Sequence, residues 1–195
     1  MEHYLSVIKE CLEEGISPRC HLEDITRADI YGYVVPFCLE LMKLMKEYQI
    51  PIKIRACDTM GYGVNYPGAV IPRSVQGIIY ALHTHAGVPH ELLEWHGHND
   101  FYKAVVNSST AWLYGCSGVN TSLFGIGERT GNTPLEAMVF EYAQLRGTLN
   151  GMDTRVITEL AEYYEKEIGY HIPPRTPFVG KNFMSQERVF MQTVC

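Results

Sequence analysis

The sequence predicts an α/β protein built around a parallel sheet. Short β-like runs alternate four times with longer amphipathic stretches, which is the pattern of successive βα units. Polar or glycine-rich segments follow each β-like run. A chain of 195 residues can bury one core, and four strands suffice for an open doubly wound sheet, whereas a closed (β/α)8 barrel needs about 250 residues. Length alone therefore favours the open sheet, and the motifs have to decide.

The first half of the chain supplies two βα units. A helix is expected over 2–14, ending near Gly15, and a short strand is expected at Arg19–Glu23. The next helix, 27–48, contains Pro36, which should kink or split it because proline has no amide hydrogen. Ile52–Asp58 is the second expected strand, before a loop rich in glycine and proline.

The second half repeats this alternation. A helix is expected from about Pro72 to Ala86, since proline suits the first turn of a helix. The remaining elements are expected, in order, as a strand at Leu92–His98, a helix at 101–115, a strand at Gly118–Leu123, and helices at 133–147 and 153–168. A proline-rich segment then leaves the domain.

Composition excludes several classes of partner. The net charge of −6 argues against nucleic acid and anionic membranes, which select basic surfaces. No basic leader and no apolar run long enough to span a bilayer is present, so we expect a cytoplasmic protein. The six cysteines are scattered without a CxxC pair, which predicts reduced, buried thiols.

The segment EWHGHND carries the strongest local signal. His96 and His98 are two residues apart in a predicted strand, so both imidazoles lie on one face and can reach one ion. The alternative is a pair of histidines without an ion. LHTHAG provides an internal comparison, because His83 and His85 have the same spacing in a predicted helix, where such residues diverge. Those two are expected to face solvent.

Polar residues also follow the other strands. In GIGERTGNTPLE, three glycines allow a tight turn, and Asn132 lies where the next helix should begin, the position of an N-cap. HLEDITR places His21 and Glu23 at the end of the first strand, and RACDTMG places Thr59 at the end of the second. Four polar strand ends in succession converge on one rim, as in barrel enzymes.

Together these motifs resemble the family of metal-dependent acyl-CoA condensing enzymes and lyases, which includes isopropylmalate, homocitrate and Re-type citrate synthases and hydroxymethylglutaryl-CoA lyase. The matching pieces are ED..R, DT.G, HxHND and G.GER.GN..LE, in the family's order and over nearly the whole chain. The segments HLEDITRADIYGYVVPF and IRACDTMGYGV are most similar to Re-type citrate synthase.

The resemblance implies a fragment of a (β/α)8 TIM barrel, its last four βα units. It implies that His96, His98 and Asn132 hold a divalent metal, with a further acidic ligand on a strand outside this chain. His21, Glu23 and Thr59 then bind the substrate, with Glu23 and Thr59 as the catalytic pair, although relatives commonly have serine at position 21. Glu128 and Arg129 are expected to brace their loop.

The implied reaction is the condensation of acetyl-CoA with the 2-oxo acid oxaloacetate to citrate and CoA. The metal acts as a Lewis acid on the keto oxygen. Manganese is our first expectation, although the residue types also suit Mg, Zn or Co. The fragment alone is expected to be inactive, and the whole enzyme to be a homodimer. The alternatives are a homocitrate or 2-isopropylmalate synthase fragment, a non-catalytic half-barrel that binds metal, or a half that complements a separate chain.

The expected division is a half-barrel at 1–150, a helix and linker at 151–183, and an aberrant tail at 184–195. The tail, MSQERVFMQTVC, is a one-base frameshift of one possible encoding of NVTRAGIHADGL, a stretch typical of relatives at this place. We therefore expect an out-of-frame tail without a fixed place in the fold.

Overall fold

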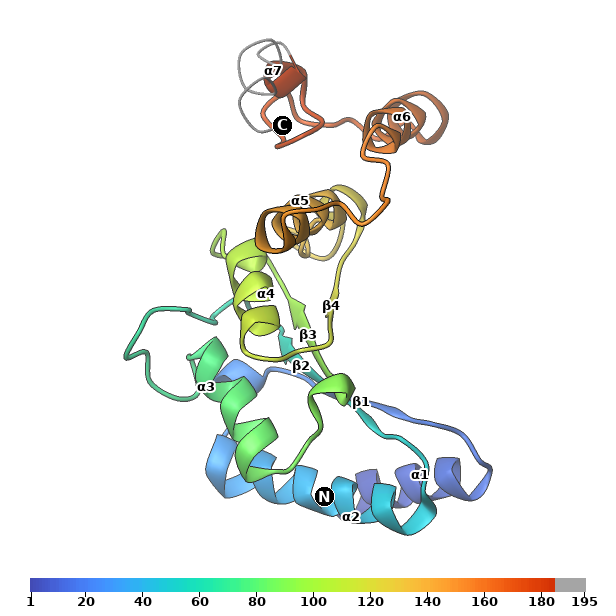
Figure 1. The fold of residues 1–195 in the computed structure, drawn as a ribbon, viewed down its shortest axis with the longest axis vertical. Helices are drawn as coiled ribbons and strands as arrows, with labels where there is room; N and C mark the ends of the chain where they lie inside the picture. Colours follow the sequence, from blue (N-terminus) through green and yellow to red (C-terminus); the bar gives the residue numbers. More distant parts are fainter. Residues whose placement is uncertain (185–195) are drawn as a thin grey trace. The chain divides into compact units, whose positions relative to one another are not determined.

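The computed structural model describes residues 1–184, which form two compact units, Met1–Thr133 and a second unit that begins at Pro134. The first unit contains, in order, α1 (Glu2–Glu13), β1 (Arg19–Leu22), α2 (Val35–Tyr48), β2 (Lys53–Asp58), α3 (Val75–Tyr80), β3 (Leu93–Gly97), α4 (Ala104–Leu113) and β4 (Gly118–Asn120). The second contains α5 (Leu135–Arg146), α6 (Val156–Tyr163) and α7 (Lys181–Met184) (Figure 1).

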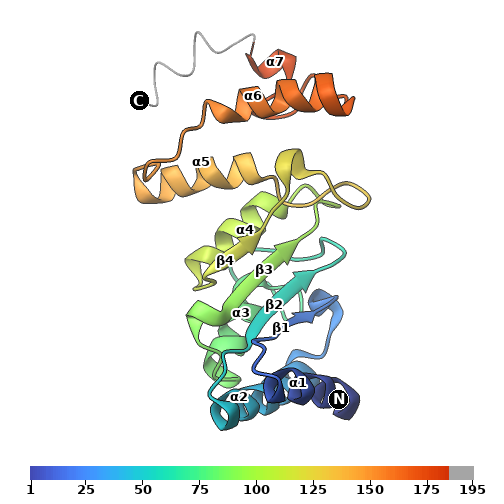
Figure 2. The same cartoon turned by 90° about the vertical axis from the view of Figure 1, so that its right-hand side faces the viewer.

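The four strands form one parallel sheet in the order β1-β2-β3-β4, with Cys57 opposite His96 and His96 opposite Asn120. One face of this sheet is apolar. Its strand residues share a single buried cluster with residues of α1 to α4: Cys20, Ile54, Ala56, Leu93, Trp95, Ile8, Leu12, Leu41, Ile78 and Ala111. Figure 2 shows the opposite face of the strands, with α3 and α4 behind them.

This arrangement decides between the two expected architectures. A doubly wound sheet reverses its strand order and carries helices on both faces, whereas here the order is sequential and the helices of the first unit pack on one face. That is the construction of a barrel wall, so the predicted (β/α)8-barrel fragment is confirmed. The open sheet favoured by length was wrong. Chain length limits how many strands can form, but it does not determine on which face of the sheet the connecting helices pack.

Several boundaries differ from the sequence prediction for local reasons. The stretch expected as one helix over 27–48 is divided directly before Pro36, as that proline predicted: a π-helical turn at Ile30–Val34 precedes α2, and Pro36 lies in the first turn of α2. Pro72 precedes α3 rather than opening it, and the Ser74 hydroxyl caps that helix by accepting from the amide of Gly77. β4 ends at Asn120 instead of residue 123.

Two further predictions concern the sequence ends and the thiols. The five cysteines in the described part are all free, and four of them are buried, as expected. Within residues 1–184 no helix is long and apolar enough to cross a membrane. The division at residues 150 and 183 stays a prediction, and the expected tail lies outside the described residues except for the backbone of Met184.

Candidate metal and substrate site

The polar face of the sheet carries the site, and alternation along the strands places its residues there. On β3, Trp95 points into the apolar core, so His96 and the following His98 point to the other side. Their Nε2 atoms are 3.1 Å apart. Both Nδ1 atoms are buried and have no hydrogen-bond partner in the described part of the chain. The two imidazoles thus converge on one point, as the spacing predicted.

Burial, and next the neighbouring His98 imidazole, lower the pKa of His96 below its usual value. The neutral imidazole that results is the form that binds metal ions.

The second histidine pair, His83 and His85, has a different environment. His85 is exposed, as predicted, but His83 is half-buried, with Nδ1 2.9 Å from the Val88 carbonyl oxygen and its ring stacked on His90, so the prediction that it faces solvent was wrong.

Asn132 reaches the same place through backbone pairing. It forms an isolated antiparallel bridge with His98, and its amide donates to the Gly125 carbonyl at 2.9 Å. It is not an N-cap, because Pro134 occupies that position before α5. Its Oδ1 atom is buried and without a hydrogen-bond partner among residues 1–184. A Cβ on Gly127 would lie 2.6 Å from Oδ1, so only glycine leaves room for this amide.

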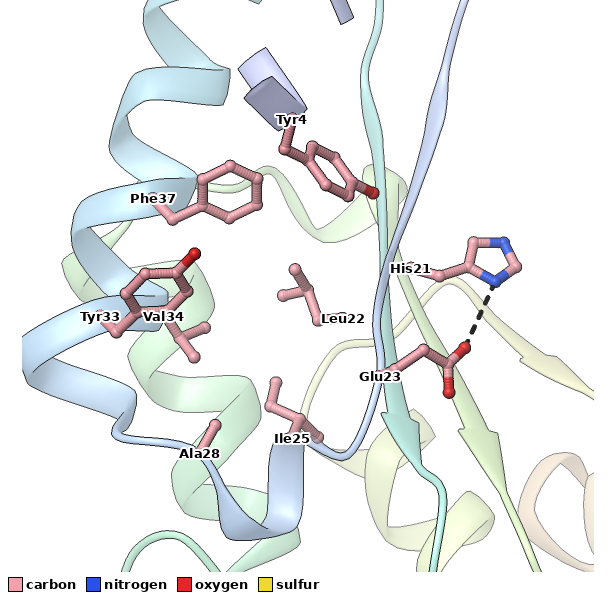
Figure 3. A pocket seen from close by; sticks show the side chains of 9 residues that line it. All are labelled: Tyr4, His21, Leu22, Glu23, Ile25, Ala28, Tyr33, Val34 and Phe37. Atoms are coloured by element: carbon pink, nitrogen blue, oxygen red, sulfur yellow. Dashed lines mark ion pairs between the residues drawn. The ribbon is translucent and has the colours of Figure 1, made fainter. Parts of the chain in front are cut away.

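Glu23 and Thr59 form the second predicted pair, and the structure brings them together. The Thr59 hydroxyl donates to Glu23 Oε2 at 2.8 Å and accepts from the amide of Asp24 at 2.7 Å. This fixes one carboxylate oxygen of Glu23. The other, Oε1, lies 3.8 Å from His21 Nδ1. Figure 3 shows His21 and Glu23 on the opposite side of the β1 backbone from Leu22 and Ile25, and all four residues line a pocket of about 190 Å³.

Arg129 links the ends of three strands, a role consistent with the expected brace. Its guanidinium donates to both carboxylate oxygens of Asp100, at 2.9 and 3.1 Å, and also to the Thr59 carbonyl. Asp100 follows the histidine pair, and Arg129 belongs to the loop that carries Asn132. Glu128 is exposed and lies 3.6 Å from the Arg129 guanidinium.

Two features of this face were not predicted. Cys57 is buried two residues before Thr59, and its Sγ lies within 4.8 Å of ligand atoms of His21 and Glu23. Strand alternation back from Thr59 would have identified it. Glu94 is also buried on this face, within hydrogen-bond distance of three cations, Arg19, Lys53 and Arg55. Burial favours a raised pKa for Glu94, but these cations outweigh it and lower the pKa.

The residues present fit a divalent cation. Two nitrogen ligands bonded at about 2.1 Å to one ion stand about 3.0 to 3.4 Å apart, which agrees with the 3.1 Å between the two Nε2 atoms. Asn132, whose backbone pairs with His98, has a buried side-chain oxygen without a hydrogen-bond partner among residues 1–184, so it is available as a third donor. Imidazole and amide donors suit Mn, Mg, Zn and Co alike.

Comparisons with known proteins show which family this sequence matches. The HMGL-like family profile matches residues 4–163. The chain is 67% identical over 183 residues to the citrate (Re)-synthase of Clostridium kluyveri and 58% identical to that of Syntrophus aciditrophicus, covering 94% of this chain in both cases. It spans 40% and 29% of the lengths of these two relatives.

Solved structures show the same fold. The HMG-CoA lyase of Bacillus subtilis matches with a TM-score of 0.63 at 20% identity, over 93% of this chain and 58% of that one. An HMG-CoA lyase from Acinetobacter baumannii, in complex with coenzyme A and 3-methylmalate, matches with a TM-score of 0.62 at 18% identity, over 88% of this chain and 55% of that one. With its profile match over most of its length and its barrel-wall fold, the chain belongs to the HMGL-like family.

Proposed function

We propose that this chain is the metal-binding part of a citrate (Re)-synthase-like acyltransferase, which joins acetyl-CoA to oxaloacetate and releases citrate and CoA. The observation that carries the proposal is the convergence of His96 and His98 on the sheet face that also bears the Glu23–Thr59 pair. Sequence identity of 67% to a protein named citrate (Re)-synthase supports the choice of substrates.

In this proposal His96, His98 and Asn132 hold the cation, which when bound polarises the carbonyl of the 2-oxo acid. Glu23 and Thr59 act on the substrate. Because Thr59 holds Glu23 Oε2, the Oε1 atom keeps a fixed direction and can accept a hydrogen bond or a proton beside His21. His21 adds a polar contact for a substrate carboxylate or hydroxyl.

HMGL-like enzymes generally depend on a divalent metal. We propose manganese for this chain, a homodimer for the whole enzyme and the cytoplasm as its compartment. We further propose that the chain is a half-barrel that does not turn over alone, since it spans less than half of either citrate (Re)-synthase relative. The remaining ligand and the strands that close the barrel then come from outside it.

A chimera tests the proposal. The matched segment of the Clostridium kluyveri relative is replaced by this chain's 183 matched residues, and CoA release is measured with acetyl-CoA, Mn²⁺ and each of three 2-oxo acids. We expect release with oxaloacetate, loss of at least about 100-fold in rate with His96→Ala, and little change with His85→Ala, which has the same spacing outside the site.

The substrate panel also distinguishes the alternatives. Preference for 2-oxoglutarate or 2-oxoisovalerate over oxaloacetate would assign the chain to homocitrate or isopropylmalate synthesis, for which the 30% identity to homocitrate synthase 1 of Nostoc is the supporting observation. Metal binding by the isolated chain together with an inactive chimera would instead indicate a non-catalytic module.

A further inference from the structure

We propose that His21, Glu23 and Cys57 form a second cation site, separate from the His96–His98–Asn132 site and suited to a thiolate-preferring ion such as Zn²⁺. One imidazole nitrogen, one carboxylate oxygen and one thiol sulfur lie within 4.8 Å of one another. It shares no residue with the first metal site, but it uses His21 and Glu23, which the proposed function assigns to the substrate, so a cation bound here would compete with the substrate for Glu23 Oε1.

Three groups converge there because two strands are in register. His21 on β1 pairs with Arg55 on β2, so Cys57 lies one pleat further along the same polar face. His21 and Glu23 point to that face from β1 (Figure 3). The cysteine is fully buried, whereas the histidine and the glutamate are exposed. The thiol therefore forms the floor of the site, and the other two groups form its rim.

The separation of the rim atoms suits one ion. His21 Nδ1 and Glu23 Oε1 are 3.8 Å apart, against about 3.4 Å for two ligands bonded at about 2.1 Å in a tetrahedron. Both side chains are exposed at the edge strand, so small rotations close the difference. Glu23 Oε2 is already fixed by Thr59 at 2.8 Å, which leaves Oε1 for the ion.

The donor set indicates which ion. A thiolate disfavours Mg²⁺ and Ca²⁺, which prefer oxygen ligands, and mixed nitrogen, sulfur and oxygen donors suit Zn²⁺ or Co²⁺. Three protein ligands leave a fourth position open, as in catalytic rather than structural zinc sites. On binding, the cation replaces the thiol hydrogen and the proton leaves to solvent. Cys57 lies opposite His96 in the pairing of β2 with β3, so the proposed cation would be held on the face that also carries the histidine pair.

Cobalt titration tests the site, because Co²⁺ bound to a thiolate gives a charge-transfer band in the near ultraviolet that oxygen and nitrogen ligands do not give. The full chain is used with Cys11→Ser and Cys195→Ser, so that neither contributes a thiolate. We expect the band in this background, its loss in Cys57→Ser and its retention in Cys116→Ser, another buried cysteine. His96→Ala should keep the band while lowering the number of bound ions from two to one.

A second variant guards against misfolding of the Cys57 mutant. His21→Ala removes an exposed ligand, should leave the circular dichroism spectrum and melting temperature unchanged, and should weaken Co²⁺ binding at the thiolate site at least tenfold. A band that survives Cys57→Ser, or that never forms at saturating Co²⁺, would overturn the proposal. So would loss of the band in His96→Ala, because the two ligand sets would then hold one ion. None of these outcomes depends on citrate formation.

Discussion

The imidazoles of His96 and His98 meet edge to face at the end of β3, with ring centroids 4.9 Å apart and an interplanar angle of 89°. Their Nε2 atoms are 3.1 Å apart, although His98 lies just beyond the end of β3, where its backbone pairs with that of Asn132. The strand positions one imidazole and the bridge to the loop positions the other, so the proposed metal site depends on both.

Removing either imidazole should weaken binding of Mn²⁺ to the isolated chain. We expect at least about a 100-fold rise in Kd for His96→Ala or His98→Ala, since even the loss of a supporting group near a metal costs about 10- to 100-fold. Titration of free Mn²⁺ by electron paramagnetic resonance measures this. His85→Ala is the matched control and should bind as the wild type does, and equal Kd values for all variants would contradict the assignment.

Gly127 should matter for metal affinity more than for folding. In Gly127→Ala the new methyl group would lie 2.6 Å from Asn132 Oδ1, and the amide must rotate away from the histidines. We expect about a tenfold weaker Kd for Mn²⁺ with a nearly unchanged melting temperature. Gly118→Ala is the control, because a Cβ there meets no atom within 4 Å. If both variants bound Mn²⁺ alike, Asn132 would not be a ligand.

Glu94 should contribute to stability as the shared anion of three cations. Its side chain is 9% exposed and lies 2.7 Å from Arg55, which is 15% exposed, whereas Arg19 and Lys53 remain more than 40% exposed. We expect Glu94→Gln to lower the free energy of unfolding by about 1–3 kcal/mol, measured by urea denaturation. Glu40→Gln removes an exposed pair with Lys43 and should change it by less than about 0.5 kcal/mol.

The buried thiols should resist alkylation at neutral and mildly alkaline pH. Burial raises the pKa of Cys20 to about 11, and that of Cys38 and Cys116 to about 12. Since the thiolate is the reactive form, each thiol stays protonated until the pH approaches these values. In a Cys195→Ser background, mass spectrometry after iodoacetamide treatment at pH 8 should show labelling at Cys11, and at all five remaining cysteines only after unfolding. Rapid labelling of Cys38 in the folded chain would contradict the predicted packing.

The sequence by itself determined which side chains lie on the polar face of the sheet and at its carboxyl rim. Alternation along the predicted strand placed His96 and His98 on one face, and the structure agrees, with Trp95 on the apolar face between them, because the two faces of a strand follow from residue parity alone. The positions of Glu23 and Thr59 directly after two successive strands predicted that both lie at the carboxyl rim of the sheet, where they hydrogen-bond. Local spacing was sufficient for these residues.

Tertiary structure decided what spacing could not. The position of Asn132 predicted an N-cap and only the family resemblance implied a metal ligand; the later start of α5, with Pro134 as its N-cap, and the bridge to His98 exclude the cap. Alternation places Cys57 on the polar face, but it lies beside His21 and Glu23 only because β1 and β2 pair in register, which is a long-range relation. Chain length also did not determine whether the helices cover one face of the sheet or both. The helices pack on the face where the strands bury apolar side chains, and this depends on the assembled sheet.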